Sequence, residues 1–349
     1  MADIINKIKN LYFDSYGKSE ILINSLPRSG SDRQYFRIKE SSYTIIAAYN
    51  PVREENEAFV GFSRHFLKAG INVPEIFYYF PDDCIYFLQD LGNDNLYLWL
   101  ENKPVSSGFD QSTKDLYKKI LDSLILFQTI GIQGIDLNWC YPHKHFDRQS
   151  MMWDLNYFKY MFLKLMAVPF NEKLLEKDFI VLCDYLLQVR QDYFLYRDFQ
   201  TANVMILDNE AWFIDYQGGR AGAPQYDVAS LLYDAKIQMV DQDRKELLGY
   251  YINNFCSITG EDKNKYLDYY YGFSMIRVMQ ALGAFGFRGL YEKKPTFTES
   301  IVPGVNNLIK ISEEGESCIY LPELFKTIRS VPDTPLFRDL LSEINEIKG

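Results

Sequence analysis

The feature that most constrains this chain is a short β-type segment inside a long helical region. Residues 204–207 (Val-Met-Ile-Leu) and 212–214 (Trp-Phe-Ile) are apolar runs, and the turn formers of residues 208–210 separate them. Two such runs around a short turn predict a β-hairpin. Around it, apolar residues recur at the spacing of helices, over residues 155–167, 177–189, 228–239, 244–255, 265–285 and 337–347.

The first ninety residues have a different pattern. Four apolar or alternating runs predict strands, at residues 34–39, 43–49, 76–80 and 84–89. Between them, Phe59, Phe62 and Phe66 recur at helical spacing, which predicts a helix over residues 53–69 that ends at Gly70. The layout predicts an α+β fold, with a small β-rich lobe in residues 1–92 and a larger helical lobe in residues 93–349.

The first helix of the larger lobe is predicted to begin after Ser112. This residue is a favourable N-cap, and Asp115 three positions later resembles a capping box. Leu116, Ile120 and Leu124 then form one apolar stripe, and Gly131 marks the stop.

Charge and composition exclude several classes of protein. The net charge of −10 disfavours a nucleic-acid partner, because phosphate backbones require a positive surface. No apolar run reaches membrane-spanning length, and the chain starts without a signal-peptide pattern. The five cysteines are scattered, which is typical of reduced thiols. We therefore expect a cytoplasmic protein with no membrane partner; the sequence does not indicate the oligomeric state.

The hairpin region carries the clearest chemical pattern. Residues 197–203 follow the order R-D-x-x-x-x-N, with Asp198 and Asn203, and Asp215 closes the second apolar run. This is the order of a kinase catalytic loop and its metal aspartate. A carboxylate at Asp198 can accept the proton of an attacking hydroxyl. Amide and carboxylate oxygens at Asn203 and Asp215 suit Mg²⁺. The pattern predicts a kinase that uses ATP and Mg²⁺; alone, it would also fit an ordinary loop and turn.

Two segments of the small lobe are candidates for nucleotide binding. Ser29, Gly30 and Ser31 precede a strand, and the N–H groups of such a turn can cover phosphates. Residues 89–91 (Gln89, Asp90 and Leu91) end another strand before Gly92, and their backbone is a candidate partner for an adenine edge. An ordinary hairpin turn and a strand end would produce the same two patterns.

A glycine-rich segment, residues 218–224, follows the metal aspartate. Asp227 is predicted to cap the helix that starts there and to fix the loop. Arg220 is a candidate contact to phosphate or substrate, although a solvent-facing side chain is the simpler expectation.

Taken together, these motifs resemble the aminoglycoside phosphotransferase-type family, which has the protein-kinase-like two-lobed fold. Within it, the chain is most similar to the bacterial anomeric kinases of N-acetylmuramate and N-acetylglucosamine. The resemblance spans about residues 26–290. It rests on residues 33–37 (R-Q-Y-F-R), 70–74 (G-I-N-V-P), 90–92 (D-L-G), the R-D-F loop, the I-D-Y-Q segment ending at Gln217, and residues 277–285.

The chain departs from the general kinase pattern in two ways. Tyr196 and Gln200 stand where the family has histidines. No lysine lies in residues 43–49, where kinases carry a phosphate-binding lysine; the anomeric sugar kinases resemble this chain in that respect. Arg33 and Arg37 are the candidate replacements, because guanidinium groups bind phosphate well. One of the acids in residues 54–57 is a candidate to orient such an arginine, unless these acids form only a solvated face.

The resemblance implies a small-molecule acceptor, here a sugar phosphorylated at its anomeric hydroxyl. Gln200, Gln217 and Arg277 are candidates to contact the other sugar oxygens. The first alternative is a kinase of choline, an aminoglycoside or another small alcohol. A cationic acceptor would need acids such as Asp154, Asp234 or Asp241. The second alternative is a nucleotide-binding pseudokinase with a regulatory role.

Overall fold

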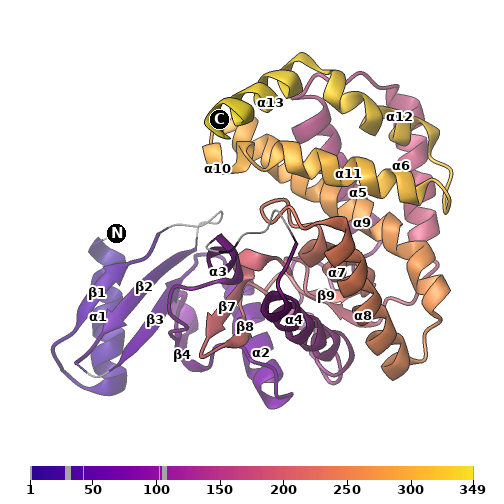
Figure 1. Cartoon of the computed structure of the whole chain (residues 1–349). Coiled ribbons are helices and arrows are strands. Elements are labelled where there is room, and N and C mark those ends of the chain that lie inside the picture. Colours follow the sequence, from indigo (N-terminus) through magenta and orange to yellow (C-terminus); the bar gives the residue numbers. More distant parts are fainter. Residues whose placement is uncertain (1, 28–32, 42, 102, 104–107, 349) are drawn as a thin grey trace.

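The structure is a computed structural model that describes residues 2–27, 33–41, 43–101, 103 and 108–348. Figure 1 shows a sheet with its two helices at one end and a larger helical assembly at the other. The described helices include none with the length and apolarity needed to cross a membrane.

The N-terminal part is a five-stranded antiparallel sheet in the order β1-β2-β3-β5-β4. Its strands are β1 (Leu22–Ser25), β2 (Gln34–Lys39), β3 (Thr44–Tyr49), β4 (Ile76–Phe80) and β5 (Ile85–Gln89). The four predicted strands are confirmed to within one residue. β1 was not predicted. It is a four-residue strand whose side chains are mostly exposed, and for this reason its sequence has no apolar run that would mark it as a strand.

Two helices cover the opposite faces of this sheet, α1 (Ala2–Tyr16) and α2 (Arg53–Lys68). Successive residues of a strand point to opposite faces. Accordingly Phe87 packs in the cluster with Ile8 and Tyr12 of α1, whereas Tyr86 packs with Phe59 of α2. Helix α1 was not predicted, although its apolar residues recur at helical spacing.

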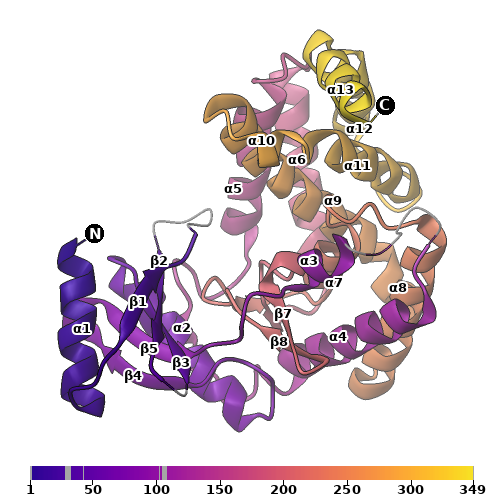
Figure 2. The ribbon, with the colours of Figure 1, turned by 60° about the vertical axis from the view of Figure 1, so that its left-hand side comes forward.

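The predicted hairpin is present as β7 (Val204–Leu207) and β8 (Glu210–Phe213). A second antiparallel pair flanks the hairpin in the sequence, with β6 (Tyr193–Leu195) before it and β9 (Arg220–Gly222) after it. The Phe213 N–H donates to the Asn72 carbonyl at 2.9 Å, so the hairpin is bonded to the segment that links α2 to β4. Figures 1 and 2 both show β7 and β8 between the sheet and helices α7 and α8.

The remaining elements are helical. Helix α9 lies centrally and contacts α5, α7 and α11. The helices after the sheet are α3 (Leu96–Glu101), α4 (Gln111–Thr129), α5 (Arg148–Phe158), α6 (Glu172–Leu186), α7 (Gln225–Leu232), α8 (Asp241–Thr259), α9 (Lys263–Phe285), α10 (Pro295–Thr298), α11 (Ile301–Gly315), α12 (Pro322–Ser330) and α13 (Pro335–Lys348).

Several predicted helix ends were wrong. Asp110, rather than Ser112, caps α4 by accepting from the Thr113 N–H. The helix predicted over residues 228–239 ends at Leu232, and in the segment that follows the Asp234 carboxylate accepts from the Thr201 N–H. The helix predicted over residues 155–167 is α5 followed by a π-helical turn, Lys159–Leu163.

Candidate active site

The loop that carries Asp198 is anchored by Asp227, a fully buried residue of α7. The Asp227 carboxylate accepts from the backbone N–H groups of Tyr196 at 2.7 Å and of Arg197 at 3.0 Å. Burial raises the pKa of Asp227 to about 7. The predicted capping role is wrong, since Asp227 lies inside the first turn of α7 and makes no capping bond. Its function is to fix the backbone just before Asp198.

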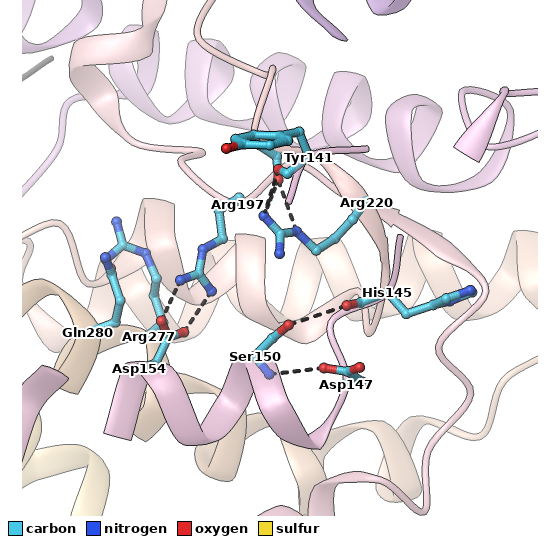
Figure 3. A network of polar contacts seen from close by, with 10 residues as sticks. Tyr141, His145, Asp147, Ser150, Asp154, Arg197, Arg220, Arg277 and Gln280 are labelled. Atoms are coloured by element: carbon cyan, nitrogen blue, oxygen red, sulfur yellow. Dashed lines mark hydrogen bonds and ion pairs between the residues drawn. The ribbon is translucent and has the colours of Figure 1, made fainter. Parts of the chain in front are cut away.

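Arg197 gives the same loop a second anchor. Its guanidinium donates to the Asp154 carboxylate of α5, with an Nη1 to Oδ2 distance of 2.6 Å (Figure 3). Its φ of 84° lies in the left-handed region, which costs free energy for a residue other than glycine. The ion pair and the two bonds to Asp227 hold this conformation, which sets the direction of the neighbouring Asp198.

Asp198, Asn203 and Asp215 come together as the sequence predicts. The Asn203 side-chain amide donates to the Asp198 carbonyl at 2.9 Å and lies 3.3 Å from the Asp215 carboxylate. Asp215 has a φ of 71°, so the chain turns sharply at the end of the hairpin. Two carboxylates and one amide therefore lie at one end of β7 and β8.

The oxygens at this point fit a hard divalent cation. Gln217 donates to the Asp215 carboxylate at 2.7 Å, while its own side-chain oxygen is buried and has no hydrogen-bond partner among the described residues. Burial, and next the charge of Asp198, raise the pKa of Asp215. Mg²⁺ prefers carboxylate and amide oxygens, and it would relieve the repulsion between the two acids. Asp215 and Asn203 are therefore the candidate magnesium ligands, with Gln217 beside them.

Arg33 lies next to this group. Only 2% of its side chain is exposed, and its guanidinium is 3.3 Å from the Glu55 carboxylate of α2 and 3.9 Å from that of Asp215. The Asn50 amide donates to the same Glu55 oxygen at 2.7 Å. Glu55 is thus the acid that orients the arginine, and the expectation of a silent acidic run is wrong for this residue.

Arg37 lies elsewhere, which corrects its prediction as a phosphate-binding group. Its guanidinium forms a bidentate pair with Asp90, at 2.7 and 2.9 Å, and also donates to the Asn93 side chain and the Gly92 carbonyl. Every guanidinium nitrogen is used, so Arg37 braces the segment after β5.

Hydrogen bonds also determine which groups of residues 89–91 stay available to bind a nucleotide. The Asp90 carboxylate is committed to Arg37, and the Gln89 N–H donates to the Glu75 carbonyl. The Leu91 N–H has no acceptor among the described residues, so it stays available to a ligand. The predicted phosphate turn, Ser29 to Ser31, lies outside the described residues.

A cavity of about 140 Å³ opens beside Asp198. Its polar lining comes from the catalytic loop, α7 and the segment after it, and α9: Asp198, Gln200, Ser230, Asp234, Arg277 and Gln280. Of the three residues predicted to contact the acceptor, Gln200 and Arg277 line this cavity, whereas Gln217 does not and lies against Asp215 instead. Ser230 and Gln280 were missed, since their only sequence signal is their helical spacing from Asp227 and Arg277.

Arg220 is not solvent-facing, which corrects that expectation. It is 6% exposed and donates to the backbone carbonyls of Gly218 and Tyr141. Figure 3 shows it beside Arg197. Burial, followed by the charge of Arg197, lowers the pKa of Arg220 to about 10. Its bonds tie the glycine-rich segment to the chain before α5, and it does not line the cavity beside Asp198.

Comparison with solved structures confirms the protein-kinase-like two-lobed fold. A choline kinase from Cryptosporidium parvum matches with a TM-score of 0.61 at 12% identity, over 94% of this chain and 99% of that one. An ADP-bound aminoglycoside phosphotransferase, APH(2'')-Ib, matches with a TM-score of 0.56 at 13% identity, over 91% and 99% of the two chains.

Comparison of sequences identifies the family. An N-acetylmuramate/N-acetylglucosamine kinase from Pseudomonas aeruginosa is 24% identical over 231 residues, so the match spans 64% of each chain. A protein of the same name from Neisseria meningitidis is 20% identical over 239 residues, or 68% of each chain. The model of the phosphotransferase enzyme family matches residues 23–263, and the chain therefore belongs to that family.

Proposed function

We propose that this chain transfers the terminal phosphoryl group of ATP to a hydroxyl of a small-molecule acceptor. The observation that carries the proposal is the position of Asp198. Asp198 lines the cavity, and its backbone carbonyl accepts from Asn203, which lies against Asp215. One short loop thus joins an acceptor cavity to a metal-binding group. Residues 1–92 would serve as the nucleotide-binding lobe and residues 93–349 as the acceptor-binding lobe.

The residues divide the chemistry between them. The acceptor oxygen forms a bond to the terminal phosphorus, its proton passes to Asp198, and the bond to the ADP oxygen breaks. Asp215 and Asn203 would hold magnesium, which neutralises charge on the phosphates when it is bound. Asp227 and Asp154 act through the backbone and through Arg197 to keep Asp198 in place. Positioning of this kind supplies most of the rate in phosphoryl transfer.

Arg33 is proposed as the cation that replaces the missing lysine. It lies beside Asp215 and is oriented by Glu55, so it needs little rearrangement to meet a phosphate. We expect Arg33→Ala to raise the KM for ATP or lower kcat by about tenfold or more, as for a lost charged hydrogen bond. Arg33→Lys should recover part of this loss.

Steady-state kinetics with varied Mg-ATP measures the effect of Arg33. Arg53→Ala is the matched control, because Arg53 lies on the exposed side of α2 and pairs with Glu57. Wild-type kinetics in Arg33→Ala would mean that another group holds the phosphates.

For the acceptor, we propose the anomeric hydroxyl of an N-acetylated amino sugar. The matched relatives are named for such sugars. The cavity supports the proposal with hydrogen-bonding groups suited to sugar oxygens, from Gln200, Ser230 and Gln280. An anomeric hydroxyl is also more acidic than an ordinary alcohol, so the carboxylate of Asp198 is a sufficient base.

A cationic acceptor such as choline or an aminoglycoside is less well supported. Asp154 is paired with Arg197, and Asp241 with Arg244 and Lys310. Asp234 lines the cavity, but it accepts bonds from Thr201 and from the Lys236 N–H. The ring of Tyr233 lines the cavity and is of a kind that binds ammonium groups, but the Arg244 guanidinium already lies 4.5 Å from its centre.

A pseudokinase is the second alternative, and the absent lysine was its main support. Arg33 beside Asp215 supplies a cation at that point. We therefore favour an active enzyme.

All five cysteines are unpaired, which agrees with the reducing cytoplasm, where ATP is also available.

Phosphorus NMR tests the proposed reaction. The protein is incubated with Mg-ATP and a panel of N-acetylglucosamine, N-acetylmuramate, glucose, choline and an aminoglycoside. We expect a sugar 1-phosphate resonance with the N-acetylated sugars. Product at a non-anomeric hydroxyl, or turnover of choline or the aminoglycoside alone, would refute the sugar assignment and leave the kinase assignment intact. ADP release without any phosphorylated acceptor would count against a sugar as the acceptor and also against choline as the acceptor.

A further inference from the structure

One buried arginine in the cavity lacks a carboxylate partner. Arg277 is 6% exposed, and no carboxylate of the described residues lies within ion-pair distance of its guanidinium. Arg33 and Arg244, which are buried to a similar degree, each pair with an acid, and so does the less buried Arg197. A buried charge without an opposite charge is costly, so such a site is suited to an anion that arrives from outside.

The bonds of Arg277 fix its guanidinium and leave one nitrogen free. Nε donates to the Ser230 hydroxyl at 2.8 Å, and Nη1 donates to the Gln280 side-chain oxygen at 2.9 Å. Within the described part of the chain, Nη2 has no acceptor. Since α7 and α9 supply both partners and pack on one another, the guanidinium is held before any ligand binds. A preorganised donor loses little entropy on binding.

The nearby acids do not neutralise Arg277 by direct contact. Asp227 lies close enough that Arg277 lowers its pKa, but its oxygens accept from the backbone of the catalytic loop. Asp234 is bonded to Thr201. Asp198 is the proposed base, so it must stay free to accept the proton of the acceptor. Among these groups the positive charge of Arg277 remains available in the cavity.

We propose that the preferred acceptor carries an anionic group, a carboxylate or a phosphate, that binds Arg277 while its reacting hydroxyl meets Asp198. This inference rests on the proposed sugar kinase function and adds the charge of the substrate. Both residues line one cavity, so one molecule can contact both. Arg220 is also buried and has no acid at ion-pair distance among the described residues, but it donates to backbone carbonyls and lies outside this cavity, so it is not an alternative. Arg277 is then a specificity-determining residue.

Two sugars that share the same N-acetylated ring and differ by one carboxylate-bearing substituent provide the test. N-acetylglucosamine is neutral, and N-acetylmuramate is the same ring with an added lactyl carboxylate. We expect wild-type kcat/KM to favour the anionic sugar by about 10- to 100-fold, the usual value of a hydrogen bond to a charged group. Arg277→Gln should bring the ratio close to one, mainly through the KM of the anionic sugar, and Arg277→Lys should keep part of the preference. N-acetylglucosamine 6-phosphate distinguishes a phosphate from a carboxylate.

Arg329→Gln is the matched control, because Arg329 is half-exposed on α12 and pairs with Glu316 far from Asp198. Melting temperatures of all variants show whether each is folded. If wild type and Arg277→Gln show the same ratio, or if wild type prefers the neutral sugar, the anion site is refuted and the sugar kinase proposal stands. If no sugar is phosphorylated by wild type, the proposed function fails, and the anion site with it.

Discussion

Replacement of Asp198 by Asn is expected to lower kcat by about 10²-fold or more while the fold and nucleotide binding are retained. The substitution preserves the size of the side chain and removes its capacity to accept a proton. A decrease in kcat of this size is usual when a general base is lost. The loop itself should keep its conformation, since Asp227 and Asp154 hold it through the backbone and Arg197.

The measurement is single-turnover phosphorylation of the acceptor, with ATP binding followed by calorimetry. Asp208→Asn is the matched control, because it makes the same chemical change at an exposed position in the β7–β8 turn. Near-normal turnover in Asp198→Asn, with normal turnover in the control, would show that another carboxylate is the base.

Replacement of Asp215 by Ala is expected to abolish the magnesium-dependent part of nucleotide binding, and Asn203→Ala to weaken it. Asp215 supplies the only carboxylate that contacts the amides of Asn203 and Gln217 in the described structure, so no second acid can take its place. A divalent cation bound through few protein oxygens depends strongly on each of them.

Titration of ATP with and without magnesium checks this expectation. Glu210→Ala, an exposed acid of β8 paired with Lys119, is the control. An unchanged magnesium dependence in Asp215→Ala would mean that the metal binds at another group. A loss of ATP binding without magnesium as well would point to damage of the fold, which a melting curve would reveal.

Local patterns in the sequence determined much of the fold. The strands at residues 34–39 and 76–80 and the helix at 53–69 agree with the structure to within one residue. Their signals are alternation and helical spacing, which depend on neighbours in the chain. The catalytic loop was predictable for the same reason, since Asp198, Asn203 and Asp215 lie within 18 residues of one another.

The partners of long charged side chains were decided by the tertiary structure. The sequence offered Arg33 and Arg37 as equals; only the folded sheet brings Arg33 to Glu55 and Asp215 and commits Arg37 to Asp90. Likewise, only the packing of α7 against the catalytic loop assigns Asp227 to the backbone of Tyr196 and Arg197.

The tertiary structure also decided which charges are paired around the cavity beside Asp198. The family resemblance of the sequence made Arg277 a candidate contact to the acceptor, but the lack of an acid beside it is seen only when α7, α9 and residues 197–203 are in place. A side chain of this length can reach many partners, and the partner it obtains depends on contacts between residues that are distant in the chain. The sequence therefore predicted most of the elements and the candidate catalytic residues, and the packing between elements decided which charges are paired and that Arg277 has no acid beside it among the described residues.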